Sequence, residues 1–285
     1  MTRQGAWLSV FGRSDVGLVR TNNEDAFVVA DLMVSDPIHA MPQPITLQIG
    51  IRGVLLAVSD GMGGAQAGEV ASALTLHSVR VEMPAGEGGS VEAALTASVQ
   101  KANERVWKTA ADTGQHGMGA TLTAVLIHGA RAYVAEVGDS RAYVLRGNRF
   151  YQLTRDQSYV QSLVDAGAIT DEESEFSQFK NIIMQAIGTE PSVVVALNRF
   201  SLRRGDRILL CSDGLTGKLK DDEIRNLLSG VTSLSAACTQ LIDLANARGG
   251  EDNVTVVLAV VDGDDLPAHS GDERISLETI QAFPA

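Results

Sequence analysis

Asp60, Asp139 and Asp213 each stand next to a glycine, shortly after a run of mostly apolar residues. One such aspartate after a strand usually marks a turn, because glycine accepts backbone angles that other residues avoid. Several in one chain indicate carboxylates that converge at the ends of buried strands. Oxygen ligands with few His or Cys partners select Mg²⁺ or Mn²⁺ over Zn²⁺, so the chemistry indicated is that of hard divalent cations.

Further acidic residues stand directly before apolar runs. The pair Glu24-Asp25 precedes the run 26–30, and Asp252 precedes the run 254–261. Buried carboxylates raise one another's pKa and oppose ionisation, and divalent cations resolve that conflict. On the residues alone, a two-metal hydrolytic site and a set of unconnected turn residues both remain open. The candidate ligand set is Asp25, Asp60, Asp213 and Asp252, with Asp139 nearby.

The apolar runs predict the elements that must position these acids. We expect strands at 6–11, 26–30, 54–58, 121–128, 132–137, 142–145, 150–153, 193–200, 207–211 and 254–261. We expect helices at 67–83, 91–111, 158–167, 221–228 and 235–247, with Ser90 as the N-cap of the second. Consecutive strands joined by hairpins, with helices grouped in pairs, favour an α+β sandwich with helices outside packed sheets.

The composition narrows the class of protein. The net charge is −12, from 23 basic and 35 acidic residues, which argues against a nucleic-acid partner. The only cysteines, Cys211 and Cys238, fall in a predicted strand and a predicted helix and are expected to be buried and unpaired. The first residues lack the apolar segment of a signal peptide, and no 18-residue apolar stretch occurs, so we expect a cytoplasmic protein without a membrane partner.

Two segments differ in character from the rest of the predicted domain, which spans 1–262. The span 155–190 contains the acidic stretch 171–180, and we expect it to form a mobile flap or subdomain. The span 263–285 is an acidic tail, expected to be loosely held, in which 275–280 is compatible with a short helix.

An ordered set of short motifs carries a resemblance that covers nearly the whole chain, from Phe11 to Val261. The sequence resembles the metal-dependent protein phosphatases, the type 2C Ser/Thr phosphatases, in their compact bacterial form. Each motif is weak alone, but their order along the chain is specific. The motifs are Arg20-x-x-Asn23-Glu24-Asp25, Asp60-Gly61-Met62-Gly63-Gly64, Gly138-Asp139-Ser140-Arg141, Leu153-Thr154-x-Asp156, Ser212-Asp213-Gly214-Leu215-Thr216 and Asp252-Asn253-x-Thr255.

The resemblance implies a four-layer α-β-β-α sandwich, in which two packed antiparallel sheets are flanked by antiparallel helix pairs. It also implies two Mg²⁺ or Mn²⁺ ions in a cleft at one edge of the sheets. By this resemblance Asp60 bridges the two ions, and Asp213 and Asp252 hold the first. A single type 2C catalytic domain over 1–262 follows.

The same resemblance assigns the second ion and a weaker third. The backbone carbonyl of Gly61 reaches the second ion, and Glu24 and Asp25 act there directly or through bound water. Asp139, together with Asp213, is placed at a third metal.

The activity implied is hydrolysis of phosphoserine and phosphothreonine in proteins by a water or hydroxide that bridges the two ions. Arg20 would clamp the phosphate with two parallel hydrogen bonds, and Asp60 and Arg20 are the residues expected to carry catalysis. Taken alone, Arg20 would be read as a surface ion pair with Glu24. The implied partners are phosphorylated proteins and a bacterial Ser/Thr kinase, and the implied state is a monomer.

Three departures from the family pattern concern substrate access and leave the ligand set intact. Met62 stands where many members have a histidine, and Gln157 replaces the histidine of the usual Asp-His-Ser. The segment 176–185 lacks the usual His-Pro and Thr-Arg pairs. An alternative therefore stays open, in which the chain is a catalytically weak module that binds phosphoproteins. Turnover that depends on metal separates the two.

Overall fold

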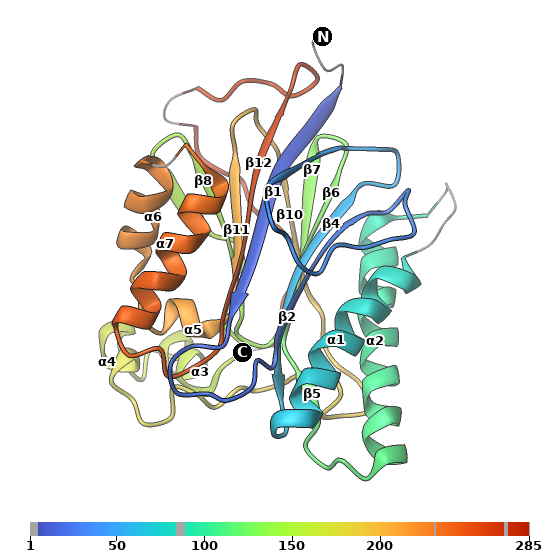
Figure 1. Ribbon diagram of the computed structural model, residues 1–285, viewed down its shortest axis with the longest axis vertical. Helices are drawn as coiled ribbons and strands as arrows, with labels where there is room; N and C mark the ends of the chain where they lie inside the picture. The colour runs from blue at the N-terminus through green and yellow to red at the C-terminus, as the bar shows by residue number, and fades with distance from the viewer. Residues whose placement is uncertain (1–4, 84–88, 231, 271–272, 285) are drawn as a thin grey trace.

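The computed structural model of the chain describes residues 5–83, 89–230, 232–270 and 273–284. Two antiparallel β-sheets pack face to face, and a pair of helices covers the outer face of each (Figure 1). This arrangement confirms the predicted α+β class and its four α-β-β-α layers.

The first sheet has the strand order β3-β1-β12-β11-β8-β9. The pairing of β1 with β12 joins segments far apart in the chain, because Ala6 lies opposite Gly263 and Asp15 opposite Val254. The strands are β1 (Ala6–Asp15), β3 (Ile45–Gln48), β8 (Arg141–Arg146), β9 (Arg149–Gln152), β11 (Arg207–Cys211) and β12 (Val254–Gly263).

The second sheet has the order β13-β10-β7-β6-β4-β2, and a short β5 also pairs with β4. Asp60 and Gly61 lie inside β4, so this motif continues the strand rather than following it as predicted. The strands are β2 (Asp25–Asp31), β4 (Val54–Met62), β5 (Gly119–Ala120), β6 (Leu122–His128), β7 (Arg131–Val137), β10 (Ala196–Ser201) and β13 (Glu278–Gln281).

The helices form the outer layers, and α3 and α4 lie within the span 155–190 that is predicted to form a flap. Ser90 caps α2 as predicted, since its Oγ accepts a hydrogen bond from the amide of Ala93. In Figure 1 α1 and α2 lie against the second sheet and α6 and α7 against the first. The helices are α1 (Ala65–Glu82), α2 (Val91–Thr113), α3 (Tyr159–Asp165), α4 (Asp171–Glu175), α5 (Asp213–Thr216), α6 (Asp221–Gly230) and α7 (Leu234–Ala247).

Alternate side chains of β4 pack into two separate hydrophobic cores. Leu56 and Val58 pack between the sheets, whereas Leu55 and Ala57 pack beneath α1 and α2. Because both faces of β4 are covered, its sequence is a continuous apolar run without a polar face. The apolar run therefore lies in the middle of the sandwich, and Asp60, which follows it in the same strand, lies at the edge.

The tail differs from its prediction. The stretch 275–280 was expected to be loosely held or helical, but Glu278–Gln281 forms β13 at the edge of β10. β-Branched Thr279 and Ile280 suit a strand, and the guanidinium of Arg199 donates two hydrogen bonds of 2.8 Å to Glu278. Residues 271–272 and 285 of the predicted tail lie outside the described residues.

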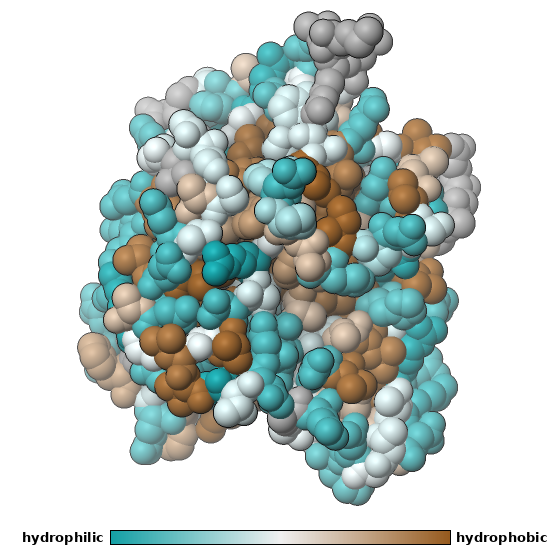
Figure 2. Space-filling model, viewed as in Figure 1, coloured by the Kyte–Doolittle hydropathy of each residue, from teal (hydrophilic) through white to brown (hydrophobic). Residues whose placement is uncertain are grey.

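The surface on the side of Figure 2 is mainly hydrophilic, with separate hydrophobic patches. Its lower outline is notched between the half with α6 and α7 and the half with α1 and α2. None of the described helices combines the length and apolar character that crossing a membrane requires.

Candidate metal centre

Strand pairing brings the first two predicted ligands together. Asp25 opens β2 directly opposite Asp60 on β4, a register that places Cβ atoms about 4.5–5.5 Å apart in antiparallel sheets. Thr121 fixes Asp60: its Oγ1 accepts from the Asp60 amide at 2.9 Å, and its own amide donates to the Asp60 carbonyl at 2.8 Å. The first pair of acids is thus held by the backbone of the second sheet.

The other sheet contributes Asp213 and Asp252. Asp213 begins α5 immediately after β11, and Asp252 immediately precedes β12. Ser212 connects the sheets, because its Oγ donates to Asp25 Oδ2 at 2.7 Å and accepts from the amide of Thr255 at 3.0 Å. All four predicted acids therefore meet at one end of the sandwich, which is the lower end in Figure 1.

Asn253 holds the loop that carries the N-terminal acids, a role that the sequence prediction did not assign. Its Oδ1 accepts from the amide of Glu24 at 2.8 Å, and its Nδ2 donates to the carbonyls of Val16 and Asn22. The signal available in the sequence was its position next to Asp252. The contact itself spans more than 200 residues of chain, so only the fold reveals it.

The acids perturb one another as expected for crowded carboxylates. Burial, together with the charges of Asp213 and Asp252, raises the pKa of Asp25 to about 7. Burial and then the charge of Asp25 raise the pKa of Asp60 well above its ordinary range. Burial and the charge of Asp252 likewise raise the pKa of Asp213. The site therefore resists ionisation of all its carboxyl groups while no cation offsets them.

Two unpartnered oxygens test whether divalent cations fit this site. Asp25 Oδ1 and Asp213 Oδ1 are buried and have no hydrogen-bond partner among the described residues. Over the same residues, no group of three or more His, Cys, Asp or Glu side chains is arranged so that it could hold a metal ion by itself. An all-oxygen set with ligands still to be supplied fits Mg²⁺ or Mn²⁺, because Mg²⁺ in particular keeps several waters when it binds protein carboxylates.

Arg20 lies at the rim of this centre and pairs with Asp252 rather than with Glu24. Its Nη2 is 3.0 Å from Asp252 Oδ2, and its side chain is half exposed. The hydrogen bond to Asp252 raises the pKa of the guanidinium, which stays charged. Glu24 turns its carboxylate toward α1, where a Cβ at Gly68 would lie 2.1 Å from Glu24 Oε2.

Gly61 and Asp139 lie beside the four central acids. A Cβ at Gly61 would meet the carbonyl oxygen of Gly68 at 2.0 Å, so only glycine allows α1 to approach β4 this closely. Asp139 lies in the turn between β7 and β8, and burial and then the charge of Asp213 raise its pKa to about 8. Both positions are compatible with the roles that the resemblance implies.

Gln157 has a structural place in this neighbourhood. It is buried, accepts hydrogen bonds from the amide of Gly138 and from Gln185 Nε2, both at 2.8 Å, and donates to the carbonyl of Glu136. These bonds tie the start of the flap to the turn that carries Asp139. The change from histidine to Gln157 therefore leaves the carboxylate set intact.

The fold is an α-β-β-α sandwich with crowded, buried carboxyl groups at one edge. The family model described as Protein phosphatase 2C matches residues 22–162. A putative protein phosphatase 2C-type from Streptococcus pyogenes is 34% identical over 257 residues, covering 89% of this chain and 98% of the relative. The chain belongs to the protein phosphatase 2C family.

Two further matches are a longer relative and a solved structure of its catalytic domain with bound manganese. The Serine/threonine protein phosphatase PstP of Mycobacterium tuberculosis is 40% identical over 266 residues, which are 93% of this chain. The chain spans about half of that relative's length, 47%. The solved catalytic domain of PstP in complex with two manganese ions is 38% identical, with a TM-score of 0.74 over 90% of this chain and 99% of that one.

Proposed function

We propose that this chain catalyses the metal-dependent hydrolysis of phosphoserine and phosphothreonine in proteins. The observation that carries the proposal is the meeting of Asp25, Asp60, Asp213 and Asp252 at one end of the sandwich, where two buried carboxylate oxygens have no partner among the described residues. Family membership and the two manganese ions of the related PstP domain support it.

The acids would share two Mg²⁺ or Mn²⁺ ions. Asp60 would contact both, Asp213 and Asp252 would hold the first, and Asp25 with the carbonyl of Gly61 would serve the second. When bound, such ions acidify a water held between them and offset the negative charge on the phosphoryl oxygens. Glu24 would act on the second ion through water, and Asp139 would contribute to a weaker third.

Arg20 would bind the phosphate of the substrate. Its guanidinium can donate two parallel hydrogen bonds to phosphoryl oxygens, and lysine lacks that geometry. In the described structure it holds Asp252 instead. The guanidinium is therefore kept at the rim, and a substrate phosphate would compete with Asp252 for it.

The substrates would be phosphorylated proteins, among them a Ser/Thr kinase and its targets, in the cytoplasm. A monomer would suffice, because all the proposed ligands come from one chain. We further propose that 1–262 forms the catalytic domain and that 155–190 forms the flap over the site.

The test is hydrolysis of a phosphothreonine peptide by the wild type, Asp60→Asn and Asp213→Asn, each with and without Mn²⁺. We expect turnover that requires Mn²⁺ and falls by at least about a thousandfold in both variants, since each removes charge from the ion site. No turnover by folded wild type that binds Mn²⁺ would overturn the enzyme proposal. Retained phosphopeptide binding in that case would favour the regulatory module.

A further inference from the structure

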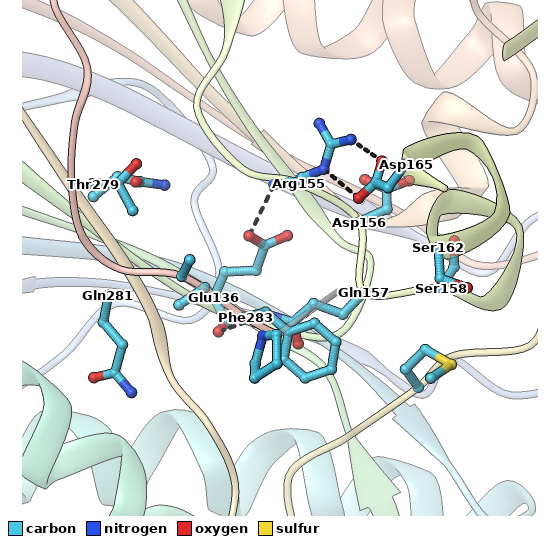
Figure 3. Close-up of a pocket in the computed structure, with 15 residues that line it drawn as sticks. Glu136, Arg155, Asp156, Gln157, Ser158, Ser162, Asp165, Thr279, Gln281 and Phe283 are labelled. Atoms are coloured by element: carbon cyan, nitrogen blue, oxygen red, sulfur yellow. Dashed lines mark hydrogen bonds and ion pairs between the residues drawn. The ribbon is translucent and has the colours of Figure 1, made fainter. Parts of the chain in front are cut away.

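A pocket lies at the side edge of the sandwich, away from the four central acids of the metal centre. It has a volume of about 140 Å³ and lies between the start of the flap, strand β10 and the C-terminal segment 279–284 (Figure 3). None of Asp25, Asp60, Asp213 and Asp252 lines it. The pocket is therefore distinct from the four central acids, although the charge of Asp139 acts on its residue Glu136.

One wall of the pocket presents two unsatisfied polar atoms. Glu136 is only 2% exposed; its Oε2 accepts from the amide of Arg155 at 3.0 Å, as Figure 3 shows, but its Oε1 has no partner in the described chain. Asn198 Nδ2 donates to the carbonyl of Leu153, whereas its Oδ1 is buried and likewise unpartnered in the described chain. Buried acceptors without donors are costly, so N–H groups of a bound molecule would stabilise this wall.

The two acceptors point the same way because of strand register. Glu136 on β7 lies opposite Ala196 on β10, and Asn198 is two residues further along β10. Side chains two residues apart on a strand share a face, so both acceptors lie on the inner face of the second sheet. Glu136 and Asn198 both line the pocket, so a molecule bound there would lie next to both side chains.

The charges around the pocket leave one acid uncompensated. Asp156 accepts bidentate hydrogen bonds from Arg141, and Asp165 forms an ion pair with Arg155. Glu136 receives only a backbone amide, and burial raises its pKa well above the ordinary range. A positively charged ligand group would favour the ionised form of Glu136 and supply the missing partner.

The remaining walls are apolar and define the size of the ligand. Met184, Ala196, Ala282, Phe283 and Pro284 line them, and the ring of Phe283 lies beside Glu136 and Gln157 in Figure 3. A cavity of about 150 Å³ engineered in another protein accommodates benzene, so this pocket can hold a body of about one six-membered ring.

We propose that this pocket binds a small organic cation, with an apolar body against Phe283 and an amidinium or ammonium head that donates to Glu136 Oε1 and Asn198 Oδ1. The C-terminal segment forms one wall, so β13 has a function in binding as well as in completing the sheet. The proposal rests on no part of the phosphatase mechanism.

The test uses benzamidine as the probe and the full chain saturated with Mn²⁺, so that the probe does not compete for a bare acidic site. Titration calorimetry at about pH 8 should show saturable binding of one benzamidine per chain. Glu136→Gln keeps the size of the side chain and should weaken binding at least about tenfold, because it removes the charge. Phe283→Ala, at the rim of the pocket, should weaken it about three- to tenfold.

Phe176→Ala is the matched control, because Phe176 is an 88% exposed aromatic residue on the flap that does not line the pocket. It should bind benzamidine as the wild type does. Absence of saturable binding to the wild type would overturn the proposal. So would unchanged affinity in both Glu136→Gln and Phe283→Ala. If Glu136→Gln does not fold, the result for Phe283→Ala decides alone.

Discussion

Two buried acids in different parts of the sandwich have opposite surroundings. Asp206, at the turn between β10 and β11, is 0% exposed and accepts from Arg146 Nε and Nη2 at 2.8 and 2.7 Å and from the amide of Arg203. Asp25, at the metal centre, is 8% exposed, and its Oδ1 has no partner in the described structure. The same residue type is thus fully satisfied at one end and incomplete at the other.

This difference separates acids that serve the fold from acids that serve a site. Arg146 is itself only 3% exposed, so its pair with Asp206 is complete without any external group. Asp25 and Asp213 face other carboxylates, and the nearby guanidinium of Arg20 pairs with Asp252 at the rim instead of with either of them. Both kinds of acid are buried, so burial does not separate an acid that serves the fold from one that serves a site. A cationic partner for the carboxylate does separate them.

The largest expected effect comes from breaking the complete pair. Asp206→Ala should reduce the free energy of unfolding by about 3–5 kcal/mol, because it leaves the buried Arg146 guanidinium with only a longer ion pair of 3.6 Å to Glu273. Urea denaturation measures the change. Glu104→Ala, which removes an exposed ion pair with Lys108, is the control and should cost less than about 0.5 kcal/mol. Equal losses of stability in the two variants would show that the buried pair of Asp206 and Arg146 contributes no more than an exposed ion pair.

Removing an acid from the incomplete group should act through metal binding instead. With Mn²⁺ at about a hundred times its Kd, the wild type should gain about 2.7 kcal/mol of stability. Asp213→Asn should lose most of this gain while unfolding no more readily than the wild type without metal, since it relieves like-charge repulsion. Thermal denaturation with and without Mn²⁺ measures both quantities. An undiminished Mn²⁺ effect in Asp213→Asn would place the ions elsewhere.

The pH dependence should follow from the raised pKa values of about 7 for Asp25 and about 8 for Asp139. These two groups bind protons more tightly in the folded, metal-free protein than in the unfolded chain, so their contribution to stability should be full below about pH 4, decline as pH rises from about 4 to 7–8, and be lost above that. Mn²⁺ affinity should rise over the same interval, because ligation requires ionised carboxylates. Melting curves between about pH 5 and pH 9 test this, and a metal-free stability that rises with pH would contradict it.

The smallest effect on stability is expected at the rim. Arg20→Lys should change the free energy of unfolding by less than about 0.5 kcal/mol, because the pair with Asp252 is exposed. The same change should raise KM for a phosphopeptide about tenfold, because bidentate phosphate binding is lost. Parallel denaturation and steady-state kinetics separate the two. An unchanged KM would remove Arg20 from the substrate site.

The sequence predicted the acids better than it predicted what holds them. Asp60 and Asp213 were found because glycines follow them after long apolar runs, a local signal. The bonds from Ser212 to Asp25 and from Asn253 to Glu24 join segments more than 180 residues apart, and no local pattern contains them. The sequence suggested the nearby Glu24 as an alternative ion-pair partner of Arg20. In the folded protein Arg20 instead pairs with Asp252.

The short edge strands escaped prediction for a related reason. β3 lies in a proline-rich excursion, and β13 lies in an acidic tail, so composition obscured both. β3 pairs with the edge of β1, and β13 pairs with the edge of β10. These edges exist only in the folded sheets. Glu136 was visible as an acid within an apolar run, but the pocket around it depends on β13.

The pairing of β1 with β12 determines when the molecule can assemble during synthesis. β1 occupies the interior of its sheet, yet its partner ends at Gly263. A ribosome must therefore release more than 240 residues beyond β1 before that sheet can close, and contacts of such long sequence separation slow folding. Asp252 enters with β12. Until β12 has been synthesised, β1 can pair only with β3, and the last proposed ligand, Asp252, joins the others only together with β12.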